Sequence, residues 1–127
     1  MEQRNDLLQP LKGLRILVAD DEFLITAAIE DTLEEAGAET VCAATILAAL
    51  EGAADETLSV ALLDVRFGRQ TTEEVADRLA GRAVPFLFYS GQDLPDGIRA
   101  KHPAARLLIK PVAPLAFIEA ILSIVKH

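Results

Sequence analysis

The chain has 127 residues, of which 51% are hydrophobic, so it has the length of one domain and enough apolar side chains to bury a core. Its 20 Asp and Glu against 12 Lys and Arg give a net charge of −8, which disfavours binding to nucleic acid or to an anionic membrane. No apolar run approaches the roughly 20 residues of a membrane span, and the N-terminus does not resemble a signal peptide. We therefore expect a cytoplasmic protein that binds cations or cationic partners.

Short apolar runs alternate with segments of helical period, which is typical of an α/β fold built from crossover units. Five strands are predicted, at residues 14–19, 39–44, 58–63, 84–89 and 106–109. Most of them are continuously apolar, as in a parallel sheet with helices on both faces. This pattern predicts a doubly wound domain over residues 14–127, preceded by an N-terminal extension over residues 1–13.

The segments between the strands predict the helices. Four are expected, at residues 22–37, 45–54, 71–81 and 113–127. Gly37 should close the first, Thr45 should open the second, and Thr71 or Thr72 should open the third. Segment 91–105 is poor in helix formers and contains two prolines and two glycines, so any helix in it should be short.

Polar and charged side chains stand at the ends of four predicted strands. Asp20 and Asp21 follow the first strand, Asp64 the third, Ser90 the fourth and Lys110 the fifth. In the flavodoxin-like strand order 2-1-3-4-5, ligands bind at the carboxyl edge of the sheet, where these ends meet. Each residue alone has a structural explanation as a helix cap, a turn or a strand end. Together they predict one pocket with three carboxylates, a hydroxyl and an ammonium group.

With Pro111 after Lys110, these residues resemble the receiver domains of bacterial response regulators, and the resemblance extends over nearly the whole chain. It implies that Asp64 accepts a phosphoryl group from a phosphohistidine donor. It also implies that Lys110 pairs with one phosphoryl oxygen and that the Ser90 hydroxyl binds another. The activity would be phosphotransfer and self-dephosphorylation, without turnover of a metabolite.

The resemblance further implies a magnesium site. Two carboxylates about 4 Å apart repel each other by roughly 4 kcal/mol unless a cation neutralises them. The implied ligands are Asp21, Asp64, Asp20 (directly or through water) and the backbone carbonyl of Arg66. The implied partner is a sensor histidine kinase or a histidine phosphotransfer protein.

Two features depart from the family pattern. Leu107 stands where receivers have Tyr or Phe, and Tyr89 cannot simply replace it, because adjacent strand residues point to opposite faces. The segment after Asp64 lacks the usual proline. A degenerate receiver that binds partners without phosphorylation is therefore an alternative. A phosphatase of the haloacid dehalogenase type is disfavoured because "ADDEF" contains no DxD, and a flavodoxin-like carrier because the acids would repel the flavin phosphate.

The signal is expected to leave through protein contacts. We expect segment 91–105 to order or shift on phosphorylation, because it has few apolar anchors. The last helix is an alternative, as a partner or homodimer surface with two apolar stripes. Leu115, Ile118, Leu122 and Val125 should face the core, and Phe117, Ile121 and Ile124 form the second stripe. Cys42 should be a small buried side chain.

Overall fold

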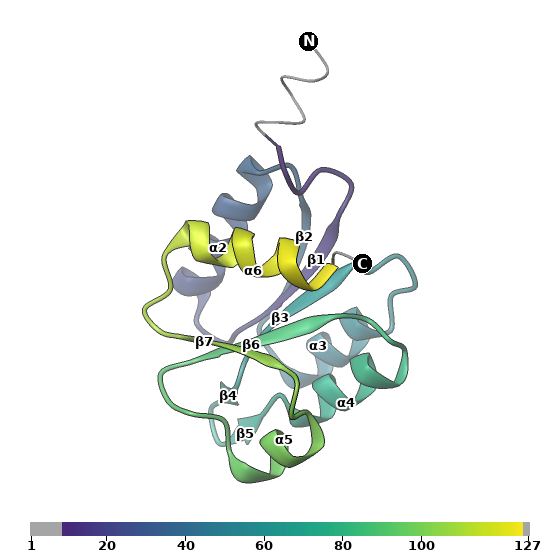
Figure 1. Cartoon of the computed structure of the whole chain (residues 1–127), viewed down its shortest axis with the longest axis vertical. Coiled ribbons are helices and arrows are strands. Elements are labelled where there is room, and N and C mark those ends of the chain that lie inside the picture. The colour runs from purple at the N-terminus through teal and green to yellow at the C-terminus, as the bar shows by residue number, and fades with distance from the viewer. Residues whose placement is uncertain (1–8, 126–127) are drawn as a thin grey trace.

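The computed structural model describes residues 9–125, so most of the predicted extension and the last two residues of the predicted domain lie outside the described part. Five parallel strands form one sheet in the order β2-β1-β3-β6-β7, which confirms the predicted flavodoxin-like topology (Figure 1). The strands are β1 (Arg15–Ala19), β2 (Glu39–Ala43), β3 (Val60–Asp64), β6 (Phe86–Ser90) and β7 (Arg106–Ile109). The helices are α2 (Phe23–Glu35), α3 (Ile46–Ala53), α4 (Glu73–Gly81), α5 (Asp96–Lys101) and α6 (Pro114–Val125).

The helices lie in two layers, one on each face of the sheet (Figure 1). Alternate residues of β1 point to the two layers: Leu17 packs with α3 and α4, whereas Ile16 and Val18 pack with α2 and α6. Every residue of β3 is buried. This two-sided burial explains why the strand sequences are continuously apolar.

The predicted helix ends are confirmed at all three places, at the third by the position of Thr72 and by the Thr71 hydroxyl, which accepts a hydrogen bond from the N–H of Glu73 at 3.3 Å. Gly37 follows α2 with φ +101°, and a Cβ there would lie 2.8 Å from the Cβ of Gln9. Thr45 caps α3 by accepting a hydrogen bond from the N–H of Ala48 at 3.0 Å. Thr72 occupies the position before α4, but its side chain does not cap the helix. Its hydroxyl instead bonds to a strand carbonyl in the site described below.

A short hairpin between β3 and α4 was not expected. Strands β4 (Arg66–Phe67) and β5 (Gln70–Thr71) pair antiparallel, and Gly68 turns between them with φ +58°. Phe67 is buried in the core beside α4, so an apolar anchor fixes the hairpin to the domain. Sequence pattern gave no sign of it, because two-residue strands are too short to show a period.

Helix α5 is short, as predicted, but the expectation of few apolar anchors is wrong. Leu94 and Ile98 are both buried in the core. Lys101 forms ion pairs with Glu73 and Asp77 of α4, at 2.5 and 2.6 Å. Burial and charge pairing together tie this segment to α4.

One burial prediction is wrong and a second is wrong in part. Cys42 is exposed, because β2 is an edge strand and the helices cover only part of its faces. In α6, two residues of the stripe expected to face the core, Leu115 and Leu122, are 62% and 37% exposed, whereas the other two, Ile118 and Val125, are partly buried against the core. Phe117 and Ile121 of the second stripe are buried. The two stripes of α6 have the same helical spacing, so spacing could not tell which one faces the sheet. Within residues 9–125, no helix is long and apolar enough to cross a bilayer.

Candidate functional site

Strand register brings the predicted site residues to one edge of the sheet. Asp64 and Ser90 are the last residues of β3 and β6, and Asp20 directly follows β1. Lys110 follows β7, and its backbone N–H donates to the carbonyl of Ser90 at 2.8 Å. The peptide bond between Lys110 and Pro111 is cis. The predicted convergence of the strand ends therefore exists.

Three carboxylates, which we call the acidic cluster, meet at this edge. Asp20, Asp21 and Asp64 each offer one oxygen, and these oxygens all lie within 4.8 Å of one another. Asp20 is fully buried and Asp64 is 6% exposed, whereas Asp21 is open to solvent. Carboxylate oxygens at this spacing, with one open side, fit a hard cation that keeps several waters.

Lys110 partly neutralises the acidic cluster. Its Nζ lies 3.3 Å from Oδ2 of Asp64. Burial, and then the negative charge of Asp20, raise the pKa of Asp64 to about 6, although Lys110 and a backbone hydrogen bond from Arg66 oppose this. One ammonium group thus compensates less than the full cost of the buried charges, which favours a further cation.

A buried tyrosine, absent from the predicted site, holds Asp20. The hydroxyl of Tyr89 donates to Oδ2 of Asp20 at 2.8 Å, and the backbone N–H of Glu22 donates to Oδ1 at 2.9 Å. Tyr89 is 1% exposed, and burial raises the pKa of its hydroxyl, so it stays protonated and can donate. A tyrosine in an otherwise apolar strand was a usable signal, because a buried hydroxyl normally has a partner.

Two further contacts were not predicted. The hydroxyl of Thr72 donates to the backbone carbonyl of Asp64 at 2.9 Å, and the N–H of Gly68 donates to Oδ2 of Asp21 at 3.1 Å. The first fixes the main chain at the end of β3. The second joins the tip of the hairpin to the exposed carboxylate. The second joins residues 47 positions apart, and the first depends on the unexpected hairpin between Asp64 and Thr72, so sequence spacing reveals neither.

The site opens to solvent through a polar pocket of about 380 Å³. Its lining residues are Asp21, Glu22, Asp64, Arg66, Ser90, Gly91, Gln92 and Lys110. The Ser90 oxygen accepts a hydrogen bond from the N–H of Gln92 at 3.2 Å, which leaves its proton for another acceptor. Asp21, Asp64, Ser90 and Lys110 line the pocket, as the strand ends predicted, whereas the buried Asp20 does not, and Glu22 and Arg66 are additions to the predicted set.

The expectation that Tyr89 does not replace the aromatic side chain missing at Leu107 is confirmed. Leu107 packs against the α3 and α4 side of the sheet, whereas Tyr89 belongs to the core on the α2 and α6 side. The two side chains thus point to opposite faces, and Tyr89 does not occupy the space of the missing aromatic ring.

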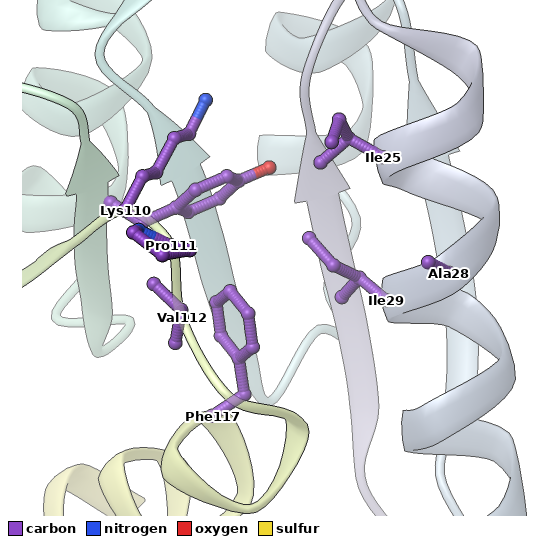
Figure 2. Close-up of a pocket in the computed structure, with 8 residues that line it drawn as sticks. Ile25, Ala28, Ile29, Lys110, Pro111, Val112 and Phe117 are labelled. Carbon is purple, nitrogen blue, oxygen red and sulfur yellow. The ribbon is translucent and has the colours of Figure 1, made fainter.

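A second, apolar pocket of about 410 Å³ lies between α2 and α6. Figure 2 shows Ile25 and Ile29 of α2 facing Val112 across it, with Phe117 of α6 at one end and Lys110 at the other. Tyr89 lines it too. Two side chains, Tyr89 and Lys110, thus touch both the acidic cluster and the apolar pocket.

No protein-family model and no curated protein matches the chain. Solved structures do match it. A CheY-like receiver domain protein from Methanospirillum hungatei JF-1 is 23% identical with a TM-score of 0.79, covering 88% of this chain and 93% of its own. A response regulator receiver protein from Sinorhizobium medicae WSM419 is 24% identical with a TM-score of 0.79, covering 92% and 98%. Chemotaxis protein CheY4 of Vibrio cholerae is 23% identical with a TM-score of 0.77, covering 87% and 98%. The chain therefore has the fold of CheY-like response regulator receiver domains.

Proposed function

We propose that the chain is a phosphoacceptor receiver that takes a phosphoryl group onto Asp64 and signals through protein contacts. The supporting observation is the position of the Asp64 carboxylate in the polar pocket, 3.3 Å from the ammonium of Lys110 and beside two further carboxylates. A nucleophile, a counter-charge and a cation site then lie within one small volume, which is what phosphoryl transfer requires.

The transfer would proceed by attack of an Asp64 oxygen on the phosphorus of a phosphohistidine. An O–P bond forms as the P–N bond breaks, and the departing imidazole takes up a proton. Lys110 would exchange its contact with Asp64 for one with a phosphoryl oxygen, and the Ser90 hydroxyl would donate to another. These two exchanges convert a change of charge into a change of contacts at the ends of β6 and β7.

The cation that fits this site is Mg²⁺. Asp20, Asp21, Asp64 and the backbone carbonyl of Arg66 would hold it, with Asp20 binding directly or through water. When bound, it supplies positive charge that offsets the carboxylates and the incoming phosphoryl oxygens. The side chain of Arg66 lines the same pocket and adds a further cationic group near the phosphoryl position.

The phosphodonor would be a sensor histidine kinase or a histidine phosphotransfer protein. Phe23 and Leu24 are 79% and 80% exposed and lie directly after the acidic residues that follow β1. Large exposed apolar side chains beside a functional site favour a protein partner. Leu115 and Leu122, exposed on α6, offer a separate surface for a downstream protein or a second copy of the chain.

One observation favours a second candidate, a receiver that binds partners without phosphorylation. Leu107 cannot supply the aromatic side chain that couples the site to the opposite surface in the family. Leu107 would affect how a signal leaves the site, but it does not decide whether Asp64 can react. Whether the chain becomes phosphorylated therefore distinguishes the two candidates.

The test is labelling by acetyl phosphate, followed by intact-protein mass spectrometry. The wild type should gain one phosphoryl group in the presence of Mg²⁺ and none with a chelator, and Asp64→Asn should gain none. Asp55→Asn is the matched control, because Asp55 is paired with Arg15 outside the site. A wild type that stays unlabelled with Mg²⁺ would favour the second candidate, and labelling of Asp64→Asn would move the acceptor to another residue.

A further inference from the structure

Tyr89 is the side chain through which the acidic cluster meets the core. Its hydroxyl bonds to Asp20, its ring lies edge-on to the ring of Phe117 with centroids 5.4 Å apart, and the Nζ of Lys110 is 5.2 Å from its centroid. The ring accounts for its packing, and phenylalanine would provide the same ring. The hydroxyl therefore needs a separate explanation.

The Tyr89 hydroxyl donates a hydrogen bond to one of the two oxygens of the buried Asp20 carboxylate. Among the described residues, Glu22 N–H donates to Oδ1 of Asp20, and Tyr89 donates to Oδ2. Asp20 is fully buried and close to Asp64, so a lost donor leaves charge uncompensated. An Asp20 oxygen without its donor would be free to turn away from the position in which it can bind a metal ion.

We propose that Tyr89 is a positioning residue, whose hydroxyl fixes the Asp20 carboxylate in the orientation that binds Mg²⁺. This inference rests on the proposed function of the acidic cluster as a metal site. Hydrogen-bond partners of metal ligands set the orientation of those ligands, and their loss commonly weakens metal binding by about 10- to 100-fold. The family resemblance at Asp64, Ser90 and Lys110 does not assign this role, because Tyr89 lies outside those motif positions.

The test compares Tyr89→Phe with the wild type and with Phe117→Leu. Tyr89→Phe removes one oxygen and keeps the ring, whereas Phe117→Leu disturbs packing in the same part of the core and leaves the Tyr89–Asp20 hydrogen bond in place. Mg²⁺ dissociation constants are measured from the metal dependence of the melting temperature. Tyr89→Phe should bind Mg²⁺ at least about tenfold more weakly. Phe117→Leu should lose stability equally with and without Mg²⁺, at an unchanged dissociation constant.

A second readout uses the wild type alone. The chain contains one tyrosine and no tryptophan, so its intrinsic emission reports on Tyr89. Mg²⁺ should change this emission with the same midpoint as the melting temperature, because the acceptor of the Tyr89 hydroxyl gains a cation. Asp20→Asn should remove the change.

The outcomes separate this inference from the function it rests on. If Mg²⁺ changes neither the melting temperature nor the tyrosine emission of the wild type, both the metal site and this inference are overturned. A wild type that binds Mg²⁺, together with a Tyr89→Phe variant of equal affinity, would overturn the role of Tyr89 alone. If Mg²⁺ stabilises the wild type but its tyrosine emission stays constant, the role of Tyr89 alone is overturned as well.

Discussion

Replacing Asp64 by Asn should stabilise the metal-free protein near neutral pH. The pKa of Asp64 is raised from 3.8 to about 6, chiefly by burial and then by Asp20. Because the folded pKa lies above the unfolded one, the folded protein binds this proton more tightly. Stability is therefore lost as the pH rises from about 4 to about 6, and the loss is complete above that range.

The structure sets the size of the effect. At about 1.4 kcal/mol per pH unit, the raised pKa corresponds to about 3 kcal/mol against the ionised form. This net value already includes the attraction to Lys110, and an amide keeps only part of the hydrogen bonding of the carboxyl group, so we expect Asp64→Asn to raise the free energy of unfolding by about 1 to 3 kcal/mol. Urea unfolding in a chelator, followed by far-ultraviolet circular dichroism, measures this difference.

Adding Mg²⁺ or lowering the pH should each remove the stability advantage of Asp64→Asn over the wild type. A saturating cation stabilises the wild type by about 2.7 kcal/mol at a concentration 100 times the dissociation constant, and the variant gains less because one ligand is missing. At about pH 4 the wild-type carboxyl is protonated, so the two proteins should be equally stable. A variant no more stable than the wild type in chelator at neutral pH would refute the reasoning, as would an advantage that persists at about pH 4.

Asp55→Asn is a control with the opposite sign. Hydrogen bonds from Thr57, together with Arg15, lower the pKa of Asp55 to about 2. Its ionised form therefore stabilises the folded protein above about pH 4, and this contribution is lost as the pH falls through about 2. The variant should be less stable than the wild type at neutral pH, equally with and without Mg²⁺.

Three further predictions concern the proposed phosphorylation switch and the scaffold. Ser90→Ala should keep labelling by acetyl phosphate but abolish any phosphorylation-dependent change in amide exchange over residues 91–105; a retained change would remove the hydroxyl from the switch. Asp77→Asn should speed amide exchange in α5, because it loses the contacts to Lys101 and to His102 Nε2 at 2.8 Å, with a cost of roughly 0.5 to 1 kcal/mol. An unchanged exchange rate would show that the contacts of Asp77 do not hold the helix. Gly37→Ala should lower the melting temperature and cost at least about 1 kcal/mol, because φ is +101° and the added carbon meets Gln9; equal stability would contradict this.

The fold could be predicted because its signals are local. Continuous apolar strands, the glycine that ends α2 and the threonine that caps α3 are readable within a few residues, and parallel strands with helical crossovers admit few topologies. The polar residues at the strand ends followed from that topology, because the carboxyl ends of parallel strands share one edge. The opposite directions of Tyr89 and Leu107 follow from the alternation of side chains along strands, together with the register that pairs Leu107 with Phe88.

Other features depended on which surfaces meet. Spacing identified two apolar stripes on α6, but only packing against the sheet selected Phe117 and Ile121 as the buried one. The edge position of β2 exposed Cys42, although its neighbours in sequence are apolar. Helix propensity made segment 91–105 look loosely held, yet α4 supplies the charges that anchor it. In each case the deciding partner is distant in sequence.

The sequence by itself determined the strand order and the residue types that gather at the carboxyl edge, because both follow from hydrophobic pattern and strand polarity. Only the tertiary structure decided how those residues are held. The hydroxyl of Tyr89 on Asp20, that of Thr72 on the Asp64 carbonyl and the amide of Gly68 on Asp21 join segments that lie up to 69 positions apart. Such hydrogen bonds leave no periodic trace in the sequence, because they depend on distance and direction in space after the chain has folded.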